Sequence, residues 1–234
     1  TGQVARINPN SGAMQGAPFQ PALQPNGNTP RWFEPARLDA NQVVIARGKV
    51  DEDLPSVIYT LSGSNPRLIK KTGELVCETP VKSNVVLAGS QLYGVLDTPE
   101  GDKLTSFTSQ PLAIVQDSAL KSDLVSGPWA TEAGVLVATS DGKLHCYQED
   151  LGLKWSADLE DGKFACAPKV IENANGGLML CYQGGNVVLL APETGELISK
   201  VDLGQPINHQ PLLKDNKMYF GGLDGTIHIV DQPK

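Results

Sequence analysis

The sequence has little positive charge: 19 Lys and Arg stand against 26 Asp and Glu, and the formal net charge is −7. No local run of basic residues offsets this balance, so a phosphate backbone would be repelled and nucleic acid is not expected as a partner. No stretch approaches the roughly 18 consecutive apolar residues of a spanning helix, so we expect no direct membrane span. The chain begins at Thr1 with neither an initiator Met nor a signal peptide, which suggests an excised or processed piece.

Cysteine is scarce and not arranged for metal or redox chemistry. The four cysteines, Cys77, Cys146, Cys166 and Cys181, include no CxxC pair, which argues against a zinc ribbon and a redox motif. We interpret them as core thiols, because free cysteine behaves as a small buried hydrophobe. The alternative is one disulfide, with Cys166 and Cys181 as the first pair to test.

Catalytic and ligand-binding spacings are missing as well. The three histidines form no HxH or HExxH pattern, and neither GxGxxG nor GxxxxGK[ST] occurs. His145 and His228 occupy equivalent places in two predicted strands, where we interpret them as packing residues. The sequence therefore predicts no catalytic residue, no cofactor and no metal site, and we do not expect an enzyme.

Glycine and proline are plentiful and spread along the whole chain, with 24 Gly and 17 Pro in 234 residues. This even distribution of Gly and Pro favours many short elements joined by turns over a few long helices. With 40% hydrophobic residues, the chain is long enough to close one core. We therefore expect a single all-β domain over residues 1–234.

Internal repeats predict the architecture. Turn dipeptides followed by short apolar strands begin at Asp141, Gly184 and Asp224, about 40 residues apart, which is the period of propeller blades. The segment Lys71–Val76 matches Glu193–Ile198 almost residue for residue, about three periods apart. A second register repeats in three dipeptides before another strand, Gly127-Pro128, Ala167-Pro168 and Gln210-Pro211.

These markers predict five sets of strands. The innermost strands are expected at Phe33–Leu38, Asn84–Ala88, Ser126–Thr131, Phe164–Val170 and Ile207–Leu213. The second strands are expected at Val43–Arg47, Leu92–Leu96, Val135–Thr139, Leu178–Tyr182 and Met218–Gly221. The third strands are expected at Val57–Leu61, Leu104–Thr108, Leu144–Gln148, Val187–Ala191 and Thr226–Val230.

The predicted fold is a β-propeller of about five four-stranded antiparallel blades, the fifth without its outermost strand. The segment Thr1–Ile7 reads like an outer strand, so we expect it to pair beside Thr226–Val230 and to close the ring. The alternative is a fragment of a seven- or eight-bladed propeller. The Pro-rich segment Pro9–Pro30 is predicted to be an irregular excursion within the domain.

The composite of Asp-Gly, an apolar strand, Thr-Gly and a Pro before the next strand resembles the repeat of the quinoprotein-type (PQQ-like) propeller family. Trp155 supplies the repeat's tryptophan in one unit. The resemblance implies the non-enzymatic branch, which includes the lipoprotein scaffold of outer-membrane assembly in Gram-negative bacteria. It also implies a bacterial, extracytoplasmic location in the periplasm or cell envelope. Enzymes of the family use a tryptophan platform, adjacent cysteines in a disulfide and calcium ligands, and this sequence has no Cys-Cys pair.

Four residues form the predicted partner or ligand surface: Arg31, Trp32, Trp129 and His209. Arginine and aromatic residues are enriched at binding hot spots, and these stand near predicted innermost strands. The competing interpretation is that the tryptophans are core residues and His209 a structural one. The expected function is a non-catalytic protein-interaction or scaffold domain that holds a protein or peptide. The alternative is a small-ligand or glycan sensor of a larger membrane or signalling protein, and a quinone-dependent dehydrogenase ranks last.

Overall fold

The computed structural model describes residues 3–21, 32–48, 55–159, 163–171, 177–215 and 217–231. These residues form 21 β-strands and no helix, so the described part contains no helical membrane span. The all-β class predicted from the sequence is confirmed. Contacts divide the chain into two compact units, residues 1–128 and residues 129–234. The single domain expected over the whole chain stays a prediction.

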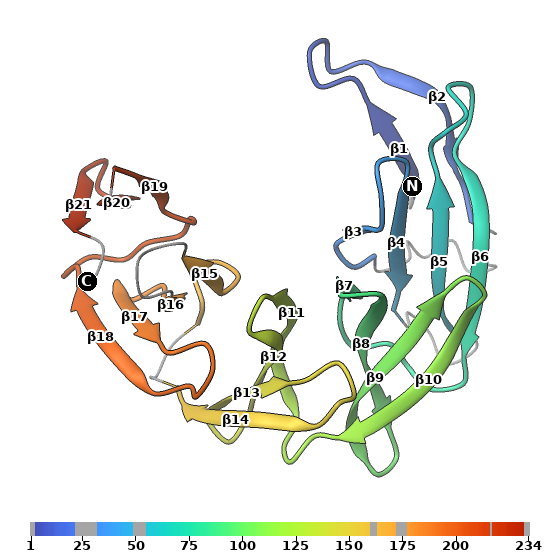
Figure 1. Cartoon of the computed structure of the whole chain (residues 1–234). Coiled ribbons are helices and arrows are strands. Elements are labelled where there is room, and N and C mark those ends of the chain that lie inside the picture. The colour runs from blue at the N-terminus through green and yellow to red at the C-terminus, as the bar shows by residue number, and fades with distance from the viewer. Residues whose placement is uncertain are drawn as a thin grey trace. The chain divides into compact units, whose positions relative to one another are not determined.

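The first unit holds a hairpin and two antiparallel four-stranded sheets, in which each strand pairs with its neighbour in the sequence (Figure 1). The hairpin consists of β1 (Val4–Ile7) and β2 (Met14–Phe19). The first sheet consists of β3 (Ala36–Arg37), β4 (Gln42–Arg47), β5 (Ser56–Ser62) and β6 (Lys70–Cys77). The second sheet consists of β7 (Val86–Ala88), β8 (Gln91–Thr98), β9 (Gly101–Ser109) and β10 (Leu112–Ala119).

The remaining sheets have the same sequential order, and the boundary between the two units falls within β11. The third sheet consists of β11 (Leu124–Thr131), β12 (Gly134–Thr139), β13 (Lys143–Tyr147) and β14 (Leu153–Asp158). The fourth consists of β15 (Lys169–Ile171), β16 (Gly177–Cys181), β17 (Asn186–Leu190) and β18 (Leu197–Asp202). The last consists of β19 (Leu212–Lys214), β20 (Lys217–Gly221) and β21 (Ile227–Asp231), and has three strands among the described residues, as predicted.

The repeated turn dipeptides have a backbone reason. Gly142, Gly185 and Gly225 connect the second and third strands of their sheets with φ angles of 75°, 100° and 83°. A residue with a Cβ rarely adopts this left-handed conformation, so glycine is needed to reverse the chain. The strands on either side of these turns therefore lie where the sequence predicts them, to within one or two residues.

Four of the five innermost strands are shorter than predicted because they are interrupted, whereas β11 extends two residues beyond its predicted start. In four sheets the chain first makes an isolated antiparallel bridge and then rejoins the ladder several residues later. Pro35, Pro168 and Pro211 lie in three of these interruptions, where the missing N–H cannot continue the ladder. The four bridges pair Trp32 with Arg47, Val81 with Leu96, Phe164 with Tyr182 and Ile207 with Gly222.

Face-to-face packing of neighbouring sheets forms the core. The second and third strands of the first four sheets are largely buried, and all of β5 and β16 is buried, whereas β21 of the last sheet alternates between exposed and half-buried residues. The fourth strands alternate between exposed and covered residues, as strands at the edge of a half-solvated sheet do. In the first unit, Val44 and Ile58 of the first sheet pack against Leu92 and Phe107 of the second. Each sheet therefore depends on a neighbour to bury its apolar face.

A contact between neighbouring repeats in the second unit involves the family tryptophan. Trp155 on β14 is buried, and its indole Nε1 donates a hydrogen bond to the Pro192 carbonyl at 2.8 Å. Gly195 lies against the indole ring, and a Cβ at this glycine would lie only 2.5 Å from a ring carbon. Lys154 adds an ion pair to Glu193 at 2.6 Å. The Thr-Gly turn after β17 is thus shaped to receive the tryptophan of the preceding sheet.

The N-terminal segment corrects one prediction. β1 pairs with β2 in the first unit, and the expected pairing of Thr1–Ile7 beside Thr226–Val230 of the second unit stays a prediction. Asn8 closes a short loop by accepting hydrogen bonds from two backbone amides, and such a local hairpin loses less chain entropy than a distant pairing. Part of the segment predicted to be irregular, Pro9–Pro30, therefore forms a strand, and residues 22–30 lie outside the described residues. Ring closure stays a prediction.

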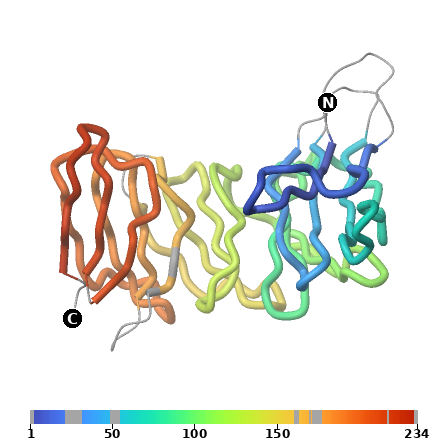
Figure 2. Tube along the Cα trace, turned by 90° about the horizontal axis from the view of Figure 1, so that it is seen from above, coloured from blue at the N-terminus to red at the C-terminus, as the bar shows by residue number. Residues whose placement is uncertain are grey.

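The hairpin covers one face of the first sheet. β2 lies beside residues 67–69, where Ala17 exchanges backbone hydrogen bonds with Arg67 and Ile69. Phe19 packs edge-on against Tyr59 of β5, with ring centroids 5.3 Å apart. Figure 2 shows the dark blue hairpin lying against the blue and cyan strands of this unit. The apolar face of β4 and β5 that the second sheet does not cover is thereby buried.

Candidate functional site

Trp32 is a packing residue of the first unit. It is half-buried, bridges to Arg47 and packs beside Tyr59 with ring centroids 6.0 Å apart. Its indole belongs to the cluster that the N-terminal hairpin covers. This arrangement favours the structural interpretation over the partner-binding one. Arg31, predicted to stand beside it at the same surface, lies outside the described residues.

Trp129 and His209 belong to the second unit and have different surroundings. Trp129 is half-buried and packs edge-on against Phe164, with ring centroids 5.3 Å apart, at the margin of the core between the third and fourth sheets. His209 is exposed in the segment between the Ile207 bridge and β19. The structure therefore places Trp129 at the margin of the core, and His209 is the accessible one of the three candidate residues that the structure describes.

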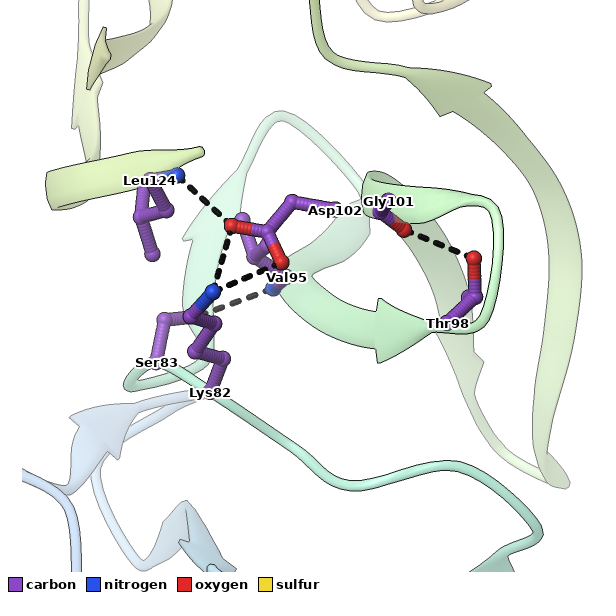
Figure 3. Close-up of polar contacts among 7 residues, drawn as sticks. All are labelled: Lys82, Ser83, Val95, Thr98, Gly101, Asp102 and Leu124. Carbon is purple, nitrogen blue, oxygen red and sulfur yellow. Dashed lines mark hydrogen bonds and ion pairs between the residues drawn. The ribbon is translucent and has the colours of Figure 1, made fainter. Parts of the chain in front are cut away.

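Buried Asp102 and half-buried Lys82 form the charged pair that most resembles catalytic machinery. The Asp102 carboxylate is 1% exposed and accepts two hydrogen bonds from Lys82 Nζ, both 2.9 Å long. The Leu124 amide donates a third hydrogen bond to it at 2.6 Å (Figure 3). The hydrogen bond from Lys82 to Asp102 raises the pKa of Lys82 above its ordinary value. Since every contact serves to join β9 to the chain segments on either side, the pair acts as a structural clamp.

The histidines also have structural surroundings. His145 on β13 is buried, and its Nδ1 is hydrogen-bonded to the Ser156 hydroxyl of β14 at 2.7 Å. His228 on β21 is hydrogen-bonded to the Thr226 hydroxyl at 3.0 Å. No group of three metal-ligating side chains occurs in the described ranges.

A groove that the sequence did not predict lies in the first unit. Its volume is about 490 Å³. Its lining comes from Val4–Arg6 of β1, from residues between Pro35 and Val43 around β3, and from Leu61, Gly63 and Ile69. We call it the Arg6–Arg37 groove. Cavities of this size hold a small molecule or a few residues of a peptide.

The charged groups of the Arg6–Arg37 groove are two arginines and one aspartate. Asp39 Oδ1 accepts hydrogen bonds from the backbone amides of Asn41 and Gln42, at 2.6 and 2.9 Å. The carboxylate is thereby turned into the loop that joins β3 to β4. Arg37 Nε donates to the Asp39 carbonyl at 2.8 Å, which fixes the arginine beside this loop. The groove is therefore locally positive on a chain whose net charge is −7.

The absence of a side chain at Gly63 leaves space for the guanidinium of Arg6, the second arginine of the groove. A Cβ at this position would lie 2.6 Å from Nη2 of Arg6, so the guanidinium rests where a larger residue would displace it. Gly63 is held by its amide, which donates to the Asn41 carbonyl at 2.7 Å. The groove thus combines residues from three stretches far apart in the sequence. No motif joins them, and the only sequence signal for it is the pair of arginines in a chain poor in basic residues.

Comparison with solved structures identifies the fold. BamB from Moraxella catarrhalis is 17% identical with a TM-score of 0.61, over 85% of this chain and 57% of that protein. BBS1N, solved in complex with ARL6DN, is 14% identical with a TM-score of 0.59, over 93% of this chain and 70% of that one. These neighbours are β-propellers. The chain has the β-propeller fold.

The propeller also resembles Saccharomyces cerevisiae Sqt1, with 14% identity and a TM-score of 0.57, over 80% of this chain and 56% of that protein. The chain spans little more than half the length of BamB and Sqt1. At these identities the similarity shows the fold and not the activity. No protein-family model matches the chain, and no curated protein matches it in sequence.

Proposed function

We propose that this propeller is a non-catalytic interaction domain that holds a protein segment in the Arg6–Arg37 groove. The observation that carries the proposal is a concave, largely apolar site with two arginines on a propeller that is acidic overall. A propeller neighbour, BBS1N, was solved in complex with a protein partner, ARL6DN. The ion pair between Lys82 and buried Asp102 is engaged in structural contacts, which supports a role without catalysis.

The occupant that fits the groove is an acidic segment in extended conformation. A carboxylate can form charge-assisted hydrogen bonds with a guanidinium, and Val4, Val43 and Ile69 offer apolar surface for alternate side chains. Among the described residues, β1 and β3 each have one hydrogen-bonded neighbour strand, so each keeps a free backbone edge. An extended segment can add to such an edge, as in other cases of strand addition.

Two further assignments belong to the same proposal. The contact between Trp155 and Gly195 gives the Thr-Gly and Trp markers of the quinoprotein-type repeat a joint packing role, which supports assignment to that family. The likeness to BamB supports the non-enzymatic branch and, with it, an extracytoplasmic location in a bacterium. Arg31 and the exposed His209 stay candidate contact residues.

The peptide proposal predicts a charge-selective interaction that depends on Arg37. Selection of random peptides displayed on phage should enrich sequences that contain Asp or Glu between apolar residues. We expect Arg37→Glu to weaken binding of a selected peptide at least about tenfold, since one charge-assisted contact is replaced by a repulsive one. Fluorescence anisotropy with the labelled peptide measures this change.

The matched control is Lys121→Glu, which makes the same change of charge at an exposed position of the same unit outside the groove. The affinity of this variant should stay within about twofold of that of the unmodified chain, because Lys121 does not line the groove and charges in solvent are screened by salt. Enrichment of neutral or basic peptides, or equal losses for both variants, would contradict the proposal. Saturable binding of a small molecule in the groove without peptide binding would favour the sensor alternative.

A further inference from the structure

Two of the four cysteines contact each other in the second unit. Cys181 ends β16 and is completely buried, whereas Cys166 is half-buried in the segment before β15. The Ala165 amide donates to the Cys181 carbonyl at 2.7 Å, which holds the two stretches of chain together. The chain bends at Ala165 and Cys166, directly after this hydrogen bond. Cys166 and Cys181 both belong to the apolar cluster between the fourth and last sheets, and each thiol shifts the pKa of the other.

The environments of the two thiols are unequal. The neighbouring Cys181 thiol lowers the pKa of Cys166, although burial opposes this shift. The Cys166 thiol and burial raise the pKa of Cys181. Cys166 is thus the more accessible thiol and the more readily ionised one, with a second thiol directly beside it. This is the arrangement of a reactive cysteine next to a resolving cysteine.

The other two cysteines provide an internal comparison. Cys77 and Cys146 are buried, and burial raises the pKa of each to about 11. The Cys146 thiol donates to the Ala133 carbonyl at 3.3 Å, and the Cys77 thiol lies 3.9 Å from the Leu75 carbonyl. At neutral pH these thiols have very little thiolate, the reactive form. The contact with a second cysteine therefore distinguishes Cys166.

We propose that Cys166 and Cys181 form a reversible disulfide by exchange with a small disulfide such as oxidised glutathione. The Cys166 thiolate attacks one sulfur of oxidised glutathione, so a mixed disulfide forms and one glutathione thiolate leaves. Cys181 then loses its proton to solvent and attacks the Cys166 sulfur, which releases the second glutathione. Two protein thiols are oxidised to one disulfide, and one glutathione disulfide is reduced to two thiols. Excess reduced glutathione reverses both steps.

The disulfide would attach the segment before β15 to the end of β16. It closes a loop of about 15 residues, and such a cross-link reduces the conformational entropy of the unfolded chain. Oxidation should therefore raise Tm by roughly 5–10 °C. The redox state of the surroundings would set the rigidity of this part of the second unit.

The test is intact-protein and peptide mass spectrometry after incubation of the folded chain with oxidised glutathione. We expect the loss of two hydrogens, mapped to a Cys166–Cys181 cross-link, and full reversal by reduced glutathione. Cys166 should react on the order of a hundredfold faster than Cys77 or Cys146, because it has the larger thiolate fraction. If both cysteines stay free while the oxidant is consumed elsewhere, or if no thiol reacts, the proposal is overturned.

Variants separate the two roles. Cys181→Ser should stop the reaction at a glutathione adduct on Cys166, since the resolving thiol is gone, and Cys181→Ala serves if a buried hydroxyl impairs folding. Cys166→Ser should give neither adduct nor cross-link. The control Cys77→Ser should form the cross-link at an unchanged rate. A Cys181→Ser chain that accumulates no adduct would show that Cys166 is not the attacking thiol.

Discussion

Trp155→Ala is expected to lower the free energy of unfolding by about 4 kcal/mol, within the range measured when a buried tryptophan is truncated. The indole is 7% exposed and fills the space between β14 and the turn that contains Gly195. Its removal leaves a cavity that a glycine turn cannot fill, and the Pro192 carbonyl loses its hydrogen bond. Urea denaturation followed by far-UV circular dichroism measures the change without relying on tryptophan fluorescence.

Trp155→Phe separates packing from hydrogen bonding. Phenylalanine keeps much of the ring contact with Gly195 but cannot donate to the Pro192 carbonyl. We expect a loss of about 2 kcal/mol, of which about 1 kcal/mol corresponds to the hydrogen bond. If Trp155→Ala cost less than Trp155→Phe, the packing interpretation of this tryptophan would fail.

Asp102→Ala is expected to cost about 3 kcal/mol, because it leaves two donors without their acceptor. The Lys82 ammonium would lose its partner, and the Leu124 amide would lose a hydrogen bond of 2.6 Å. Lys82 is 35% exposed and can recover some hydration, which places the estimate at the lower end of the range for buried pairs. Thermal and urea unfolding of the two chains measure the difference.

The control for this prediction is Asp117→Ala. Asp117 pairs with Lys103 at 3.6 Å but is 49% exposed, so its loss should change stability by less than about 0.5 kcal/mol. The Asp102 effect also has a defined pH dependence. The pKa of Lys82 is raised in the folded state, so the pair stabilises fully below the ordinary lysine value of 10.5 and loses this contribution as the pH rises beyond it. A difference between the two chains that persisted unchanged at high pH would contradict the assignment to Lys82.

Much of the fold could be predicted because its repeat depends on local chemistry. Gly142, Gly185 and Gly225 occupy turns with positive φ, and the apolar strands beside the first two are almost entirely buried. Such positions tolerate few residue types, so they are visible in a single sequence. The bounds of the innermost strands were less predictable. Prolines such as Pro168 were used to locate these strands in the sequence, but they also interrupt the backbone hydrogen bonding.

The N-terminal hairpin and the groove were not predictable from local patterns. Residues 1–7 have the alternation of an outer strand, and nothing in that pattern specifies whether the partner is β2 or β21. The Arg6–Arg37 groove depends on tertiary contacts, since Arg6 meets Gly63 only after β1 and β5 have packed. Trp32 and Trp129 were predicted from their residue type and their place near innermost strands, and in the structure both are half-buried and pack against core clusters.

The packing of Trp155 on Gly195 has a consequence for how this chain could evolve by duplication. The tryptophan belongs to one repeat and the glycine that receives it to the next, so neither repeat carries the complete contact. A copied repeat would retain the interaction only beside a neighbour with the matching partner. Substitutions at the two sites are therefore expected to be correlated among homologues, and loss of the tryptophan in one repeat relaxes selection on the glycine in its neighbour. Selection is therefore expected to act on the contact between two neighbouring repeats and not on each repeat separately.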